Sequence, residues 1–305
     1  MAPILNILEK AKEKKYGQST PNHFPIFIIG SPRSGTTIFY QILSSTLDCI
    51  YFDNLTHLAK ETPIIGKQIS QFIYGNRRHQ SFQSQYGDTS ADGLLAPSEG
   101  GQILHYLLNS SADTFMPEYF SQESLIKLKS KLFALLNIYK KPFISKNTYN
   151  SLRMELLSKV HPSTKIIWIK RDPFFTAQSI YFARKKNNTA VNKWWGVKTP
   201  SFHSDIHLPF ATQIIKQVFE IERHIFNKKN LFRKEQWLEI NYSELENPLN
   251  VVMKCEEFLG YRLSYSSSML KDITVQNTHR LTPELKDLFL HEIQKYNWDN
   301  YTKAN

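Results

Sequence analysis

Residues 30–37, Gly-Ser-Pro-Arg-Ser-Gly-Thr-Thr, combine two glycines, four hydroxyl side chains and one arginine. Glycine lets a backbone fold tightly enough for consecutive N–H groups to point at a single anion. An apolar strand is expected before this stretch and a helix after it, and the positive end of the helix dipole adds to the attraction. The pattern therefore predicts a phosphate-binding loop in which backbone amides, rather than a metal, hold the anion.

The spacing of Gly30 and Gly35 matches the start of the Walker A pattern, which continues with Lys and then Ser or Thr. Here Thr36 and Thr37 follow instead, so the lysine is missing and the positive charge is carried inside the loop by Arg33. A guanidinium is a fork of donors that can face a group being transferred from a nucleotide. Ordinary ATP hydrolysis with Mg²⁺ is therefore disfavoured.

A second group of polar residues follows an apolar strand expected over residues 166–169. Arg171 stands near the strand end, Asp172 and Pro173 open a helix, and Ser179 lies two helical turns further on. A guanidinium and a hydroxyl placed in this way can converge on one dianion. An arginine beside a helix-capping aspartate is also a common structural arrangement, so this segment gains weight only together with the first loop.

In these residues the chain resembles the sulfotransferases that use 3′-phosphoadenosine 5′-phosphosulfate (PAPS). Residues 31–37 are similar to the loop that binds the 5′-phosphosulfate, in the arginine-bearing version of tyrosylprotein and many bacterial members. Arg171 and Ser179 match the residues that hold the 3′-phosphate in that family. The resemblance implies PAPS as co-substrate, no metal, and a role for Arg33 in stabilising the departing phosphate. The residues implied to bind the nucleotide are Pro32, Arg33, Ser34, Gly35, Thr36, Thr37, Arg171 and Ser179.

Three further segments resemble parts of the same family. Residues 142–147 contain Lys146 at an expected strand end, and residues 194–200 are similar to a tryptophan-rich loop. Residues 277–283 are similar to a segment that folds over the nucleotide, where Arg280 would add positive charge. A local helix cap explains this last segment equally well.

Transfer of a sulfuryl group to an acceptor oxygen needs in-line placement, stabilisation of negative charge and a base for the acceptor proton. Glu99 is the expected base, because the resemblance places an acceptor-side glutamate in this region and the glycines after it let the backbone approach a substrate. A surface glutamate beside a glycine turn is the structural alternative. His105 is the rival, since another branch of the family uses histidine, although a histidine on such a helix is more often packed or capping.

Strand-like and helical segments alternate along the chain, which predicts an α/β fold: a P-loop-type parallel β-sheet with helices on both faces, in a single domain over residues 1–305. Ligands then bind at the carboxyl ends of the strands, where both phosphate-binding segments lie. Residues 1–22 are expected to form a helical lead-in, and residues 121–139 a helix pair. Residues 54–115 are interrupted by glycines and are expected to be irregular, forming the acceptor site and its cover.

Composition sets the remaining expectations. The chain has 305 residues, 41% of them hydrophobic, so it can bury a large core, and its net charge of +11 favours anionic partners. Because the basic runs are short and scattered, no nucleic-acid partner is expected. Two distant cysteines and the lack of an export signal or membrane-spanning stretch predict a cytoplasmic location. The basic amphipathic stretch 4–16 is expected to form a helix packed on the body of the protein, and a peripheral membrane contact is the alternative.

The sequence leaves three functions open. The favoured one is a sulfotransferase that acts on a hydroxyl-bearing acceptor, with a glycan or glycolipid ahead of a small phenol or a peptide. The second is a P-loop nucleoside or small-molecule kinase that uses ATP and Mg²⁺, which would share the loop and the sheet but lacks the lysine after Gly35. The third is a non-catalytic protein that binds anions or nucleic acid, suggested by the charge alone, whose binding would weaken steeply with salt.

Overall fold

A computed structural model describes residues 2–80, 82, 89, 92–108, 120–186, 191–265, 270, 273 and 275–302. The expected cover segment 54–115 is therefore described only in part. The strands are β1 Pro25–Ile29, β2 Ile50–Tyr51, β3 Phe143–Lys146, β4 Lys165–Lys170 and β5 Trp237–Asn241. The helices are α1 Ala2–Tyr16, α2 Thr36–Thr46, α3 Asn54–Leu58, α4 Pro63–Tyr74, α5 Gly101–Leu107, α6 Gln122–Tyr139, α7 Met154–Val160, α8 Pro173–Lys186, α9 Phe202–Asp205, α10 Phe210–Lys228, α11 Pro248–Leu259, α12 Pro283–Ile293 and α13 Asp299–Thr302. Short 3₁₀ turns occupy Thr148–Leu152, Lys229–Leu231, Lys234–Gln236 and Tyr242–Glu246.

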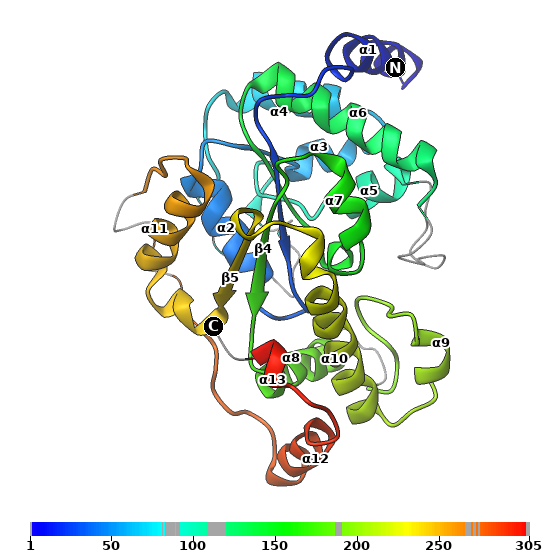
Figure 1. The fold of residues 1–305 in the computed structure, drawn as a ribbon, viewed down its shortest axis with the longest axis vertical. Coiled ribbons are helices and arrows are strands. Elements are labelled where there is room, and N and C mark those ends of the chain that lie inside the picture. Colours follow the sequence, from blue (N-terminus) through cyan, green and yellow to red (C-terminus); the bar gives the residue numbers. More distant parts are fainter. Residues whose placement is uncertain are drawn as a thin grey trace.

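The strands form one parallel sheet in the order β2-β3-β1-β4-β5. Figure 1 shows β4 beside β5. β1 lies in the middle, with Ile28 opposite Lys146 of β3 and Ile167 of β4. The chain leaves β1 toward β2 but leaves β4 toward β5, so the connections diverge between β1 and β4. Ligands of open parallel sheets bind beside such a divergence, at the carboxyl ends of the strands. The loop after β1 and Arg171 after β4 both lie there.

Alternate side chains of β1 pack on opposite faces of the sheet. Phe27 and Ile29 belong to an apolar cluster with side chains of α6, α7 and α10, whereas Ile26 and Ile28 belong to a cluster with α2 and α11. All four side chains are buried, as expected for a central parallel strand. The predicted parallel sheet with helices on both faces is confirmed.

A third apolar cluster joins α8, α10 and α12, in the lower part of Figure 1. Tyr181, Val218 and Phe289 contribute one side chain from each of these helices. Because α8 carries Ser179 and begins directly after Arg171 and Asp172, this cluster fixes the helix on which the second phosphate-binding segment depends.

Two expectations about helices are wrong. Residues 121–139 contain one helix, α6, capped by the Ser121 hydroxyl, and not a helix pair. Residues 54–115 are not irregular throughout, because α3, α4 and α5 lie among them. Gly66 lies inside α4, where a Cβ would come within 2.7 Å of the Ala59 Cβ. That glycine therefore lets α4 pack closely on the end of α3, where the sequence analysis expected an interruption.

The expected helical lead-in contains α1, which packs against α4 and α6 at the top of Figure 1. The chain continues into Gly17, where a Cβ would lie 2.5 Å from the Ser130 carbonyl oxygen on α6, so the backbones pass at close range. Within the described ranges, no helix combines the length and the apolar character needed to cross a lipid bilayer.

Candidate active site

The loop after β1 is tightly folded. Gly30 and Gly35 have φ angles of +150° and +99°, a region that favours glycine. Arg33 between them has a φ of 70°, which is uncommon for a residue with a side chain. The backbone therefore turns sharply at three positions, and the conformation of Arg33 must be maintained by its contacts.

The far end of this loop begins α2. Gly35 is the N-cap, Thr36 and Thr37 are the first two residues of the helix, and no side chain caps the N-terminus. The hydroxyl of Ser34 is buried and has no hydrogen-bond partner among the described residues. Helix N–H groups without a side-chain cap and a buried hydroxyl fit the donor set of a phosphate-binding loop.

A buried carboxylate that the sequence analysis did not identify holds the base of the loop. Glu222 on α10 accepts hydrogen bonds from the Ser31 N–H (3.1 Å), the Ser31 hydroxyl (2.6 Å) and the Trp168 indole N–H (3.0 Å). Burial raises the pKa of Glu222 to about 7, although these donors act in the opposite direction. The hydroxyl of Ser151 accepts from the Gly30 N–H (3.0 Å) and donates to the Gly30 carbonyl oxygen (2.9 Å). The start of the loop is thus anchored from two sides.

The raised pKa of Glu222 predicts a pH dependence of stability. A free glutamate titrates near 4.5, so between about pH 4.5 and 7 the folded protein holds one more proton than the unfolded chain, and stability falls as the pH rises. Glu222→Gln cannot titrate. As the pH rises from about 4.5 to 7, the free energy of unfolding of the variant minus that of wild type is therefore expected to increase by on the order of 3 kcal/mol. Urea denaturation at a series of pH values measures this, and a difference that does not change with pH would contradict it.

Gly35 lies directly against Tyr242. A Cβ at Gly35 would come within 2.2 Å of the Tyr242 ring, at a φ that already strains alanine. Gly35→Ala is therefore expected to lower the melting temperature by roughly 5–10 °C and to abolish nucleotide binding. Gly260→Ala is the matched control, because Gly260 also has a positive φ but no atom lies within 4 Å of its Cβ. Equal melting temperatures in scanning fluorimetry would show that the ring contact is unimportant.

Side chains from the two predicted phosphate-binding segments contact each other. Arg33 Nε donates to the Ser179 hydroxyl oxygen at 3.0 Å, and Arg171 Nη1 donates to the Arg33 carbonyl oxygen at 2.8 Å. Arg171 also donates to the Gln276 carbonyl oxygen and to the Asn277 amide oxygen (3.3 Å). The structure therefore brings Arg33, Arg171 and Ser179 together, whereas the sequence analysis assigned Arg33 to the opposite end of the nucleotide.

Positive charge dominates this part of the site. The pKa of Arg171 is lowered to about 10, chiefly by burial and additionally by the charges of Arg33 and Arg280. Arg171 is still protonated at neutral pH, and its guanidinium lies 4.3 Å from the centre of the Tyr242 ring. A cavity of about 300 Å³ next to Arg171 is lined by Lys170, Phe175, Asn241, Tyr242 and Asn277, among others. This arrangement fits a negatively charged ligand with an apolar ring.

Glu99 is held at the carboxyl edge of the sheet. Its carboxylate forms an ion pair with Lys146, the last residue of β3, whose side chain is 3% exposed. Asn147 Nδ2 donates to the Glu99 carbonyl oxygen at 3.3 Å. In the strand register, Lys146 lies opposite Ile28 of β1. Ile28 is two residues before Gly30, where the loop begins. The ion pair therefore lies at the same edge of the sheet as the phosphate-binding loop.

The segment that carries Glu99 is attached to α3 and α4 through Asp53. Asp53 pairs with Pro97 in an isolated antiparallel bridge. Its buried carboxylate accepts from the Thr56 N–H (2.7 Å) on α3 and from Lys67 Nζ (2.7 Å) on α4. Glu99 thus belongs to a segment with defined contacts on both sides, which is what a positioned base requires.

His105, the rival base, lies on α5 and is half-buried. Its ring contacts Tyr149 edge to face, with 6.4 Å between the ring centres. Burial lowers the pKa of His105, and the charge of Arg153 acts in the same direction, which favours the neutral imidazole. Tyr149 donates to the Gly196 carbonyl oxygen (3.4 Å), and a Cβ at Gly196 would lie 3.6 Å from Pro32. The tryptophan-rich segment therefore lies against the phosphate-binding loop.

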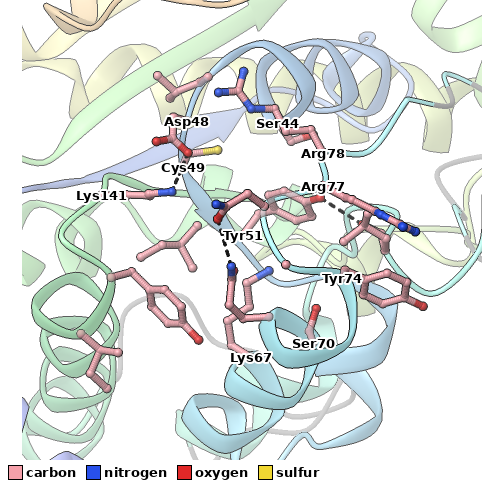
Figure 2. A pocket seen from close by; sticks show the side chains of 18 residues that line it. Ser44, Asp48, Cys49, Tyr51, Lys67, Ser70, Tyr74, Arg77, Arg78 and Lys141 are labelled. Atoms are coloured by element: carbon pink, nitrogen blue, oxygen red, sulfur yellow. Dashed lines mark hydrogen bonds and ion pairs between the residues drawn. The ribbon is translucent and has the colours of Figure 1, made fainter.

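A separate cavity of about 240 Å³ lies at the β2 edge of the sheet (Figure 2). Asp48 and Cys49 precede β2 and Lys141 precedes β3, so the cavity is at the opposite end of these strands from the loop. Lys141 and Asp48 form an ion pair there (2.8 Å). Burial raises the pKa of the Cys49 thiol to about 12, which favours the neutral thiol over the thiolate. Arg33, Glu99, Arg171 and Ser179 do not line this cavity, although Lys67, which holds Asp53, does.

Glu222 and Lys146 are the site residues for which sequence reasoning had the weakest basis. On α10, Val218, Ile221 and Ile225 form the buried apolar face, and Glu222 stands on that same face. A glutamate within an apolar helical stripe is the signal that could have identified it, because such a charge needs a buried partner. Lys146 was recognised only as a strand end, since its partner Glu99 is distant in the sequence.

A tightly folded loop after the central strand β1 and the side chain of Arg171 after β4 meet at the carboxyl edge of a parallel sheet, which is where α/β proteins of this architecture bind their ligands. Residues 25–265 match the model of the sulfotransferase family, and the chain belongs to that family of transferases. Sulfotransferase STF9 from Mycobacterium avium is similar in structure, with a TM-score of 0.57 and 14% identity over 97% of this chain and 83% of that one. Sulfotransferase STF1 from Mycobacterium tuberculosis H37Rv is similar in structure as well, with a TM-score of 0.54 and 16% identity over 93% of this chain and 81% of that one. At these identities the likeness shows a shared fold, and a comparison with curated proteins gave no match.

Proposed function

We propose that this sulfotransferase moves the sulfuryl group of PAPS to a hydroxyl group of a carbohydrate or a glycolipid. The convergence of Arg33, Arg171 and Ser179 beside the uncapped start of α2 carries the proposal. PAPS is charged at both its 5′ and its 3′ positions, so it needs two adjoining sets of donors. Arg171 and Ser179 would hold the 3′-phosphate, and the loop amides with the Ser34 hydroxyl would hold the 5′-phosphosulfate.

In the proposed reaction, the acceptor oxygen attacks the sulfur of PAPS in line with the bond between that sulfur and the bridging oxygen. A new bond forms between the acceptor oxygen and sulfur, the bond to the bridging oxygen breaks, and adenosine 3′,5′-bisphosphate leaves with the electron pair. Glu99 accepts the acceptor proton, while Lys146 holds its carboxylate in place. Arg33, whose Nε contacts the Ser179 hydroxyl in this structure, would turn toward the departing phosphate and stabilise the negative charge that grows on it.

Ligand-induced thermal shift tests the donor. Adenosine 3′,5′-bisphosphate without Mg²⁺ is expected to stabilise the protein by about 2.7 kcal/mol at a hundred times its Kd. Adenosine 5′-monophosphate, which lacks the 3′-phosphate, should stabilise it less at the same concentration. ATP with Mg²⁺ is the comparison for a P-loop kinase. A larger shift with MgATP than with the bisphosphate would overturn the proposed donor.

Transfer of radiolabelled sulfate from PAPS to a panel of glycans, glycolipids, phenols and peptides tests the acceptor. Label on a glycan or a glycolipid is the expected result. Label confined to phenols or peptides would contradict the proposed acceptor class and leave the proposed donor intact. A non-catalytic anion-binding protein would transfer no label to any member of the panel.

A further inference from the structure

Helix α1 is attached to the rest of the protein through its polar side. Glu9 is 2% exposed, and its carboxylate accepts hydrogen bonds from the N–H groups of Ile64 (3.1 Å) and Ile65 (2.9 Å) at the start of α4. Lys131 on α6 forms ion pairs with Glu9 (2.8 Å) and Glu13 (2.9 Å). A carboxylate at a helix N-terminus that also contacts a buried lysine is a well-satisfied anchor. The inner face of α1 therefore combines the paired carboxylates of Glu9 and Glu13 with the partly buried ring of Tyr16.

Three apolar side chains of α1 are exposed on its outer side, whereas Tyr16 packs against the core. The exposed apolar side chains of α1 recur at i, i+3 and i+4, which is the spacing of one helix face. The exposed apolar side chains of α4 have the same spacing. Helices α1 and α4 contact each other. Ile7 is 67% exposed and Phe72 is 91% exposed. Single exposed apolar residues are ordinary, but a triplet on one face of each of two helices that contact each other makes both helices candidates for a binding surface. The exposed apolar residues are Ile4, Ile7 and Leu8 on α1 and Ile69, Phe72 and Ile73 on α4.

The charges that α1 presents to solvent are positive. Lys10, Lys14 and Lys15 are exposed, whereas the two acidic residues of the helix, Glu9 and Glu13, are paired with the lysine of α6. Apolar residues beside exposed lysines are typical of helices that lie at the surface of membranes with anionic lipids. The net charge of +11 favours the same partner at longer range.

We propose that α1 and α4 form a docking surface for a membrane that contains anionic lipids. The apolar triplets would enter the interface, and the lysines of α1 would contact the lipid headgroups. A second copy of the chain is a poorer occupant, because a two-fold dimer through this face would bring two clusters of Lys10, Lys14 and Lys15 together. A nucleic acid would pair with the lysines but would leave the apolar triplets exposed. The proposal depends on neither the donor nor the acceptor of the proposed reaction.

Cosedimentation with lipid vesicles tests the electrostatic part. The full chain is expected to bind vesicles of equimolar phosphatidylcholine and phosphatidylserine, to bind vesicles of phosphatidylcholine much more weakly, and to be released by high salt. Lys10→Gln, Lys14→Gln and Lys15→Gln should each weaken binding to the anionic vesicles roughly five-fold. Equal binding to both kinds of vesicle would overturn the assignment to anionic lipids.

Substitution of the apolar residues tests the insertion. Ile7→Ser and Phe72→Ser are each expected to weaken binding to the anionic vesicles about ten-fold. Leu249→Ser and Met253→Ser are the matched controls, because these residues of α11 are 41% and 54% exposed and α11 packs on the other face of the sheet. The controls should bind like wild type. All four side chains are exposed, so the melting temperatures should stay close to that of wild type.

Three results would overturn the proposal. One is the absence of binding to anionic vesicles, and another is an equal loss of binding in the α11 controls. The third is a dimer, seen by light scattering, that Phe72→Ser dissociates, because this would assign the surface to self-association. None of these measurements uses PAPS or an acceptor. A failure here therefore leaves the proposed reaction untouched, and a failure of the labelling experiment leaves the docking surface untouched.

Discussion

Replacement of Arg33 by alanine is expected to lower the turnover of sulfuryl transfer by roughly 10³-fold or more. Arg33 is the only arginine in residues 30–37, so no other loop side chain can supply a guanidinium to the departing phosphate. The affinity for adenosine 3′,5′-bisphosphate should fall by only about ten-fold, because the loop amides still hold the nucleotide. Steady-state kinetics and isothermal titration calorimetry on the same protein separate the two effects.

Arg171→Ala is the variant with which the nucleotide affinity and the turnover of Arg33→Ala are compared. It is expected to weaken binding of adenosine 3′,5′-bisphosphate by about 10²-fold and binding of adenosine 5′-monophosphate much less. Some loss of turnover should accompany it, because Arg171 also donates to the Arg33 carbonyl oxygen (2.8 Å). If Arg33→Ala loses affinity as strongly as turnover, its contact with Ser179 marks Arg33 as a ligand of the 3′-phosphate. Its assignment to the departing phosphate would then be wrong.

The second large effect is expected for Glu99→Gln, which should lower turnover by about 10²- to 10⁴-fold. An amide cannot take the acceptor proton, but its oxygen can still accept a hydrogen bond from Lys146, so the geometry of the pair is retained. Binding of adenosine 3′,5′-bisphosphate should therefore stay near the wild-type value. Single-turnover measurement of label transfer reports the chemical step directly.

His105→Gln is the matched variant for the choice of base. Near-normal turnover in this variant, together with a large loss in Glu99→Gln, would support Glu99. The reverse pattern would assign proton removal to His105, whose pKa is lowered by burial so that the neutral ring is available to accept a proton. Comparable losses of turnover in both variants would indicate that both residues take part in proton removal. This outcome would contradict the proposal that Glu99 alone is the base.

Elements whose signals are local can be predicted from the amino-acid sequence. The glycines, the hydroxyls and Arg33 of the loop lie within eight residues, and the backbone conformation they require is a property of that stretch. The strand Pro25–Ile29 is apolar at every position, which indicates burial on both faces, and the two apolar clusters that share it confirm this. The family and the parallel sheet follow from such short segments and their order.

Contacts between side chains that are distant in the sequence become visible only in the folded chain. Arg33 and Ser179 are 146 residues apart, and Ser31 and Glu222 are 191 apart, so no local pattern could pair them. The same holds for α1, whose apolar stripe by itself predicts a buried face. The orientation of α1 depends on Glu9, whose carboxylate binds the N–H groups at the start of α4 and Lys131 of α6 in the interior of the protein. Contacts of this kind form only once the fold has placed their partners, because the buried groups must then find hydrogen-bond and charge partners wherever these lie in the chain.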